Sequence, residues 1–325
     1  MTHPKVELHL HLDSSLSYRI ARKLDNSLNP KSFRDKFVAP PKCKDLNDYL
    51  VRVARQVNLL QSAEALAMAS EDLVRQLAED GVIYAEVRYA PLLHIRDGLQ
   101  PEEVVETVSH TLSEASRDTD LEVRVILCTL RHFSEKQSMQ TAELAHEYRD
   151  ANIVALDIAG DESGFPLDAH RQAFEYAKDH GLMTTAHAGE AEGPDSVIDT
   201  LESLHPHRVG HGVRSHEDQK LVTHLKNQDI HLEICPTSNI QTDIYHSIRD
   251  HTISELFETG VSLSINTDGR TTSNVTLTEE YQKLTDAFGW GTQEFRICNL
   301  NAAEAAFLPG PEKDKLKEKI IEGYS

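Results

Sequence analysis

The chain has 325 residues, and its 39% hydrophobic content is enough for a substantial buried core. Its 53 acidic side chains outnumber 33 basic ones and give a formal net charge of −20, so the surface repels phosphate backbones and binding to long nucleic acid is not expected. No run approaches the roughly 18 apolar residues of a membrane span, and a patterned strand begins close to the first residue. We therefore expect a cytoplasmic protein without a signal or transit peptide. The cysteines form no Cys-x-x-Cys pair, which predicts isolated thiols at Cys43, Cys128, Cys235 and Cys298.

The first expected strand covers residues 4–13, and it has two contrasting faces because residues two apart on a strand point the same way. The apolar face carries Val6, Leu8, Leu10 and Leu12. The polar face carries Glu7, His9, His11 and Asp13. Imidazole and carboxylate groups are common metal ligands. A His-x-His pair is also expected by chance in a chain with 18 histidines, so a metal site here needs partners from elsewhere.

Further along, strands and helices alternate regularly. A helix is predicted at 15–24, then a polar, proline-containing loop at 29–44, and the stretch 45–80 is expected to hold two helices. Residues 27–60 are expected to lie over the mouth of the barrel that the strands form. Seven more strands are predicted at 81–89, 122–130, 152–159, 182–188, 208–210, 230–234 and 261–266. Helices are predicted between them at 101–116, 139–149, 168–180, 194–204, 217–226 and 252–259, and in the tail 278–325, where 302–306 would pack as a closing helix.

This alternation predicts a parallel sheet. Eight units without a linker or a change of composition favour an α/β fold consisting of a single (β/α)8 TIM-type barrel, with additional helices near the N-terminus and at the C-terminus, over an open doubly wound sheet. We expect one domain spanning residues 1–325. In such a barrel the active residues lie at the carboxyl ends of the strands.

Polar groups do follow the predicted strands. The first strand ends in His9, His11 and Asp13, and the later ends read EVR (86–88), AGDE (159–162), HAGE (187–190), GHG (210–212), CPTSN (235–239) and NTDG (266–269). His9 and His11, with a histidine from the fifth strand and an aspartate from the eighth, would form a three-nitrogen, one-oxygen zinc site with a position left for water, whose pKa zinc lowers to roughly 7.

Two further groups could act beside such a metal. Glu190, three residues after His187, could give or accept a proton. His211 lies between two glycines, which leave its ring free to orient the water. Taken alone, Glu190 is better explained as a solvated loop carboxylate until His187 is considered, and His211 could equally be a histidine that bonds a nearby backbone group.

Six motifs appear in the order seen in the adenosine deaminase family, which belongs to the metal-dependent amidohydrolase superfamily, and the chain resembles that family over essentially its whole length. They are PKVELHLHLD (4–13), LDIAGDE (156–162), HAGE (187–190), RVGHG (208–212), CPTSN (235–239) and NTD (266–268). The resemblance implies a zinc-dependent (β/α)8 barrel enzyme that hydrolyses the 6-amino group of a purine nucleoside, giving a 6-oxo product and ammonia.

The same resemblance implies a role for each matched residue. One zinc ion per chain would be bound by His9, His11, His187 and Asp268. Glu190 would protonate ring nitrogen N1 of the purine, and His211 would orient or deprotonate the zinc-bound water. Gly160 is similar to the glycine whose N–H contacts the ring, and Asp13 to the carboxylate that meets the ribose. The partners implied are a small-molecule purine nucleoside and water.

Two departures from the family pattern occur at positions that contact the substrate in the family. Gly269 stands where the family commonly has a second aspartate that hydrogen-bonds purine N7, which leaves Asp268, a water molecule, or one of Arg270, Thr271 and Asn274 to read N7. Ser14 and Ser15 follow Asp13, where the family usually has glycine. A deaminase of a related 6-aminopurine therefore stays open as an alternative: aminodeoxyfutalosine, methylthioadenosine, adenine or an N6-substituted purine nucleotide.

The sequence argues against two other classes of protein. A barrel hydrolase could cut an amide or ester bond with the same metal, but Glu190 has an obvious use on a ring nitrogen. A catalytically silent binding protein would be expected to lack a metal ligand or Glu190, and the sequence retains all of them.

Overall fold

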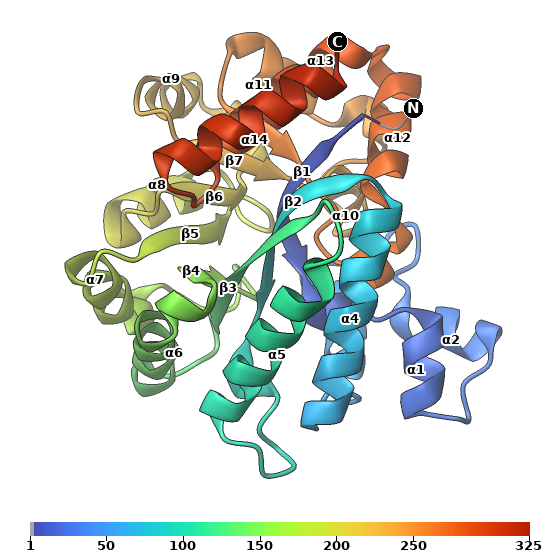
Figure 1. The fold of residues 1–325 in the computed structure, drawn as a ribbon. Helices are drawn as coiled ribbons and strands as arrows, with labels where there is room; N and C mark the ends of the chain where they lie inside the picture. Colours follow the sequence, from blue (N-terminus) through green and yellow to red (C-terminus); the bar gives the residue numbers. More distant parts are fainter. Residues whose placement is uncertain (1–2) are drawn as a thin grey trace.

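The computed structural model describes residues 3–325, and its centre is one sheet in which each strand pairs in parallel with the next along the chain. The eight strands are β1 (Lys5–His11), β2 (Val82–Tyr89), β3 (Glu122–Leu130), β4 (Ile153–Ala159), β5 (Met183–Ala188), β6 (Arg208–His211), β7 (His231–Ile234) and β8 (Leu263–Ile265). Helices surround this sheet on the outside (Figure 1). The predicted (β/α)8 barrel is confirmed.

Every strand is followed by at least one helix. Three short helices precede the first outer helix: α1 (Tyr18–Leu24), α2 (Pro30–Phe37) and α3 (Leu46–Val57). The helices between later strands are α4 (Ala63–Glu79), α5 (Pro101–Ser116), α6 (Glu135–Glu147), α7 (Arg171–Asp179), α8 (Pro194–Leu204), α9 (Gln219–Asn227), α10 (Pro236–Gln241) and α11 (Ile253–Thr259). The tail forms α12 (Leu277–Phe288), α13 (Thr292–Ala305) and α14 (Gly310–Gly323).

Most predicted helices are present, but the loop expected at 29–44 is wrong in part because α2 occupies its first half. Asn29 caps this helix by accepting from the backbone N–H groups of Lys31 and Ser32, and Pro30 takes the first helical position. Phe33 and Phe37, four residues apart, are buried on one face. Two aromatic side chains at helical spacing outweigh the polar composition of the segment.

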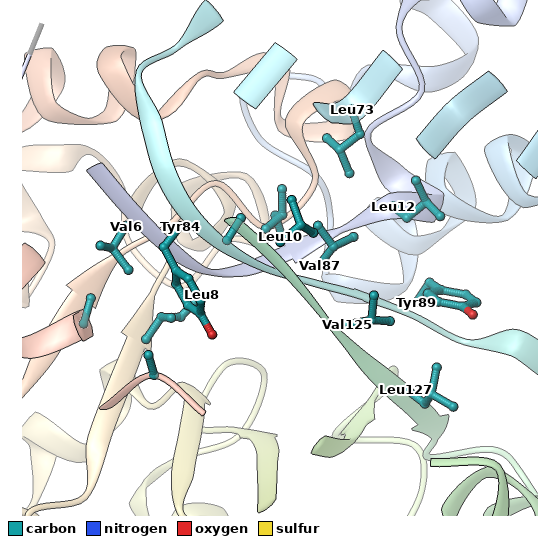
Figure 2. Close-up of a cluster of buried hydrophobic side chains, with 14 of the residues drawn as sticks. Val6, Leu8, Leu10, Leu12, Leu73, Tyr84, Val87, Tyr89, Val125 and Leu127 are labelled. Atoms are coloured by element: carbon teal, nitrogen blue, oxygen red, sulfur yellow. The ribbon is translucent and has the colours of Figure 1, made fainter. Parts of the chain in front are cut away.

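The apolar face of β1 forms part of the core, as predicted. All four of its members are at most 1% exposed, namely Val6, Leu8, Leu10 and Leu12. Figure 2 shows them beside Tyr84 and Val87 of β2 and Leu73 of α4. Burial of a leucine side chain stabilises the fold by about 1.5–3 kcal/mol, so this strand is held firmly in place.

The barrel closes where β1 meets the segment after β8. A regular ladder is replaced there by a single bridge between Leu10 and Asp268. The backbone N–H of His11 donates to the Asp268 carbonyl (2.8 Å), and the Asp268 N–H donates to the His9 carbonyl (3.0 Å). Oδ1 of Asn266 accepts from the N–H of His9 at 3.1 Å and also from that of Leu8. These bonds join the first and last strands at the carboxyl end.

Three polar residues lie elsewhere than their sequence pattern predicts. Asp13 is not on the strand but in a 3-10 turn, Leu12–Ser14, that begins where β1 ends. Pairing between β1 and β2 is irregular after Glu7, whose carboxylate accepts from Arg270 (3.1 Å) and Thr267 instead of facing the histidines. Glu86 lies within β2 and not at its carboxyl end, and its carboxylate pairs with Arg208 in the barrel interior.

Five side chains of alternating charge cross the barrel interior and are at most 1% exposed: Glu86, Arg208, Glu233, Arg88 and Asp157. The four ion pairs between neighbours in this series measure 2.5–3.1 Å between nitrogen and oxygen. An unpaired charge in such a place would be very costly, so the five groups depend on one another. Burial raises the pKa of Glu233, but Arg88 and Arg208 outweigh it and hold that pKa at about 2.

The four cysteines are buried free thiols, as predicted. Within residues 3–325 there is no helix with both the length and the apolar character needed to span a bilayer.

Candidate active site

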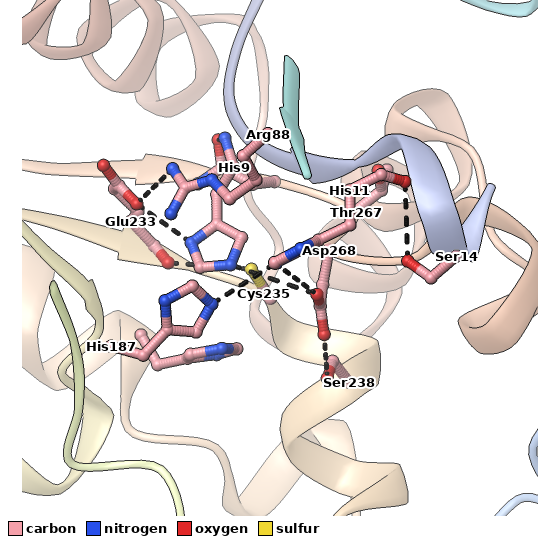
Figure 3. Close-up of polar contacts among 12 residues, drawn as sticks. His9, His11, Ser14, Arg88, His187, Glu233, Cys235, Ser238, Thr267 and Asp268 are labelled. Carbon is pink, nitrogen blue, oxygen red and sulfur yellow. Dashed lines mark hydrogen bonds and ion pairs between the residues drawn. The ribbon is translucent and has the colours of Figure 1, made fainter. Parts of the chain in front are cut away.

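The four predicted metal ligands come together at the carboxyl end of the barrel (Figure 3). Nε2 of His11 lies 3.3 Å from Nε2 of His187 and 3.5 Å from Oδ1 of Asp268. Nε2 of His9 lies 3.9 Å from the same Asp268 oxygen. The four ligand atoms therefore converge on one point, the metal point, although they come from β1, β5 and the end of β8.

The chemistry of this cluster fits a bound metal ion. Nε2 of His9 is buried and has no hydrogen-bond partner among residues 3–325. Two ligands about 2.0–2.1 Å from a tetrahedral zinc lie roughly 3.3 Å from each other, which is the spacing between His11 and His187. Burial lowers the pKa of His9 and of His11, so both imidazoles are available in the neutral, metal-binding form.

Two buried carboxylates orient the histidines. Oε2 of Glu233 bonds Nδ1 of His9 at 2.9 Å, and Oδ1 of Asp157 bonds Nδ1 of His187 at 3.2 Å. With Nδ1 engaged, each ring turns Nε2 towards the metal point. Burial raises the pKa of Asp157, but His187 and Arg88 outweigh that effect, so the net pKa is lowered and the group stays ionised.

Asp268 is held in an unusual backbone conformation. Its φ of +60° is in the left-handed region, which aspartate adopts more readily than most residues but at some cost. The Ser238 hydroxyl donates to Oδ2 (2.7 Å), and the Tyr49 hydroxyl lies 3.4 Å from the same oxygen. These two contacts hold one carboxylate oxygen and leave Oδ1 for the metal point.

Glu190 lies directly beside the metal point and is 5% exposed. Burial, with a further contribution from the charges of Asp268 and Glu162, raises its pKa well above the usual range. The loop that carries it is fixed by Glu162, whose two carboxylate oxygens accept the backbone N–H groups of residues 189–192. A rigid, protonated carboxylic acid is the form that can donate a proton to a substrate.

His211 ends β6 with a φ of +59° and packs against the other histidines, 4.8 Å from His9 between ring centroids. Gly210 makes this approach possible, because a Cβ there would lie 3.0 Å from Cε1 of His9. Nε2 of His211 lies 3.6 Å from Oε2 of Glu190, and Nδ1 lies 3.1 Å from Nδ2 of Asn239. Both predicted catalytic groups are therefore in contact with the ligand cluster.

The metal point opens into a cavity of about 600 Å³. Two of the three predicted substrate residues, Asp13 and Gly160, line it. Asp13 accepts from the Ala90 N–H (3.3 Å) and lies 3.6 Å from Nε2 of His94. Burial raises the pKa of Asp13, but the His94 contact outweighs it and the pKa is lowered, so the carboxylate is ready to accept from hydroxyl groups. The outer wall is apolar and comes mainly from α3 and the turn after β2: Leu46, Leu50, Val53, Val57, Leu92 and Leu93.

Gly269, the third predicted substrate residue, is not part of the cavity lining. Its φ of −109° is ordinary extended backbone, so conformation does not require glycine there. The available space does require glycine there, because a Cβ at this position would lie 2.5 Å from Oγ of Ser14. Ser14 itself lines the cavity. The two departures from the family pattern are thus a single exchange, in which Ser14 fills the space next to Gly269.

Three of the groups suggested for reading N7, namely Arg270, Thr271 and Asn274, are not part of the cavity lining. Arg270 pairs with Glu7 and with Asp80 (2.8 Å), and the Thr271 hydroxyl donates to the Leu16 carbonyl (2.9 Å). Asn274 is exposed and lies outside the cavity lining.

Sequence reasoning assigned no role to Glu233, Asp157, Ser238 or Asn239. Asp157, Ser238 and Asn239 lie inside the quoted motifs LDIAGDE and CPTSN, so those motifs pointed to the correct segments. Glu233 could have been found from its place in β7, where a charged residue stands inside an apolar run and must have a buried partner.

A (β/α)8 barrel with three histidines and an aspartate around one point, next to a buried carboxyl group, is the arrangement of a barrel hydrolase whose side chains could hold a metal ion. Comparisons with known proteins narrow the class. The family model described as adenosine deaminase matches residues 4–323. An adenosine deaminase of Enterococcus faecalis is 36% identical over 99% of this chain and 97% of its own length. The chain therefore belongs to the adenosine deaminase family and is a hydrolytic deaminase.

Two solved structures have the same fold. An N6-mAMP deaminase of Arabidopsis superposes with a TM-score of 0.88 and 26% identity, covering 99% of this chain and 98% of its own. An adenine deaminase of Arthrobacter aurescens superposes with a TM-score of 0.91 and 23% identity over 98% of each chain. Proteins that are named for different 6-aminopurine substrates thus share this fold.

The hydrogen bond between Nδ1 of His9 and Glu233 should strengthen metal binding. Glu233→Gln removes the negative charge that orients His9, so we expect zinc affinity to fall by roughly 10–100-fold, as measured by competition with a chromogenic chelator. Glu106→Gln, on the outer surface of α5, is the matched control and should bind zinc like the parent protein. Unchanged affinity in Glu233→Gln would show that the metal ligands do not need this partner.

Proposed function

We propose that the protein is a zinc-dependent enzyme that hydrolyses adenosine to inosine and ammonia, with residues 1–325 acting as a single catalytic domain. The observation that carries this proposal is the convergence of His9, His11, His187 and Asp268 on one point, with the buried carboxyl group of Glu190 beside them and its pKa raised by burial. A cytoplasmic location agrees with the four free thiols, which persist in a reducing compartment.

In this proposal each group has one task. A zinc ion held by the four ligands would act as a Lewis acid and lower the pKa of water. Glu190 donates its proton to ring nitrogen N1, which makes C6 electrophilic. His211 orients the attacking water, Gly160 contacts the ring through its N–H, and Asp13 accepts from the ribose hydroxyls. Burial of the site strengthens these contacts because little water competes for them.

The cavity wall favours a nucleoside over a nucleotide. Among the described residues that line it, Arg96 is the only arginine or lysine, and its guanidinium donates to Oδ1 of Asn58 at 2.6 Å. A 5′-phosphate would be drawn to a cluster of such groups. The apolar wall supports one second candidate, methylthioadenosine, whose 5′ substituent is apolar.

Ammonia release from a panel of 6-aminopurines tests the proposed substrate. The zinc-loaded protein is assayed with adenosine, methylthioadenosine, adenine, aminodeoxyfutalosine, adenosine monophosphate and N6-methyl adenosine monophosphate. The highest kcat/KM should be obtained with adenosine, since the wall offers little to a phosphate. A higher value with methylthioadenosine would establish the second candidate, and no release from any compound would contradict the proposal.

The role of Glu190 is tested separately. Glu190→Gln keeps the shape of the side chain but cannot supply the proton, so kcat should fall on the order of 10²–10⁴-fold while zinc content stays at one per chain. His187→Ala should lose both zinc and turnover. His110→Ala, on the exposed side of α5, should lose neither. Near-normal turnover in zinc-loaded Glu190→Gln would refute the acid role.

We also propose that Ser14 reads N7 of the purine. Its hydroxyl is 3.5 Å from the His11 carbonyl, beyond the ordinary range for such a bond, and Ser15 already donates to that carbonyl at 2.6 Å. The Ser14 hydroxyl can therefore turn towards a ligand. Ser14 follows β1 and Glu190 follows β5, on opposite sides of the barrel. N1 and N7 likewise lie on opposite sides of C6, so one ring can meet both residues.

A substrate without N7 tests this assignment. In Ser14→Ala, kcat/KM for adenosine should fall by roughly five- to tenfold, the size of one neutral hydrogen bond, while 7-deazaadenosine should be unaffected. Gly269→Asp alone should destabilise the protein because of the Ser14 contact. In the double variant Ser14→Gly with Gly269→Asp, the smaller residue at position 14 leaves room for the aspartate, so the protein should fold normally and prefer adenosine. An equal loss with both substrates in Ser14→Ala would argue against a contact with N7.

A further inference from the structure

The hydrogen bonds behind His211 run in a defined direction. Ile253 is the first residue of α11, so its backbone N–H has no carbonyl partner within the helix and must donate to another group. It donates to Nδ1 of His251 at 3.0 Å. Because Nδ1 accepts this bond, the proton of the neutral His251 ring is on Nε2.

The direction continues through Asn239. Nε2 of His251 lies 3.2 Å from Oδ1 of Asn239, and Nδ2 of Asn239 lies 3.1 Å from Nδ1 of His211. An amide is oriented by its partners, and here the N–H of His251 requires the amide oxygen. The Asn239 NH2 group therefore donates to His211. All three side chains are at most 2% exposed, so bulk water does not compete for these bonds.

From this network we propose that Asn239 and His251 are positioning residues that hold His211 in the tautomer with its proton on Nε2. His211 then presents an N–H donor at Nε2, the nitrogen beside Glu190. In the opposite tautomer the Nδ1 proton would meet the Asn239 NH2 group. A turned amide would in turn place NH2 against the proton of His251, whose Nδ1 is occupied by Ile253.

The consequence for the reaction rests on the proposed function. When Nε2 of His211 carries the proton, it has no lone pair with which to accept another one, so it cannot act as a general base. The remaining lone pair is on Nδ1, where it accepts the hydrogen bond from Asn239. His211 therefore donates a hydrogen bond to the attacking oxygen and stabilises its negative charge. The carboxylate of Asp268, whose Oδ1 lies 3.5 Å from Nε2 of His11, is placed to accept the proton of the attacking water, and the departing 6-amino group takes up one proton to leave as ammonia.

The tautomer is measurable without any assay. Zinc-loaded protein labelled with 15N-histidine is examined by long-range 1H–15N correlation, and the His211 and His251 signals are assigned by their loss in His211→Gln and His251→Gln. We expect an unprotonated Nδ1 and a protonated Nε2 in both rings. A protonated Nδ1 on His211 overturns the proposal, whether or not the enzyme deaminates adenosine.

Asn239→Asp supplies the second test. A carboxylate can only accept, so His211 should move its proton to Nδ1, and kcat should fall by at least about 100-fold, as expected when a catalytic histidine is held in the wrong tautomer. Zinc content should be unchanged. An Asn239→Asp protein that keeps the parent's tautomer overturns the proposal. His251→Ala, which frees the Asn239 amide to turn, should give signals from both tautomers, and a single parent-like set would also contradict it. The parent spectrum decides the question if either variant does not fold.

Discussion

The backbone bonds between Asp268 and the residues His9 and His11 are the constraint on which the site depends. They close the barrel by joining its first strand to the end of its last. The same residues are proposed to bind the metal, so closure of the sheet and formation of the site are one event. Three of the four ligands are thereby placed by main-chain hydrogen bonds before any ion binds, and little ordering remains to be done when it does.

The five charged side chains buried in the barrel interior also stabilise this arrangement. Glu233 bonds both Arg88 and Arg208 and still has an oxygen close to His9, while Asp157 divides its oxygens between Arg88 and His187. Removing Arg208 would leave the buried carboxylate of Glu86 without its charged partner, which costs several kcal/mol. The orientation of the histidines is therefore coupled to the integrity of the barrel, and small rotations of a ligand ring are resisted by the whole network.

The mouth of the cavity has a different character from its base. Polar groups with fixed partners surround the metal point, whereas α3 contributes an apolar wall on a segment that precedes the barrel helices. This division separates chemistry from specificity. The contact between Ser14 and Gly269 lies between these two parts of the cavity. A change at one of these positions requires a change at the other because both side chains would occupy the same space.

The sequence by itself determined the barrel, and it predicted the residues that are proposed to bind the metal and to act as the acid. Strand periodicity and the position of polar groups after strands are local properties, and each motif is carried by a few neighbouring residues. Only the tertiary structure decided which groups hold those residues. The pairing of Glu233 with His9, the series from Ile253 to His211, and the contact of Ser14 with Gly269 join segments far apart in the chain. Glu7 illustrates the same limit, since an irregular strand pairing turned it away from the face that simple alternation predicts.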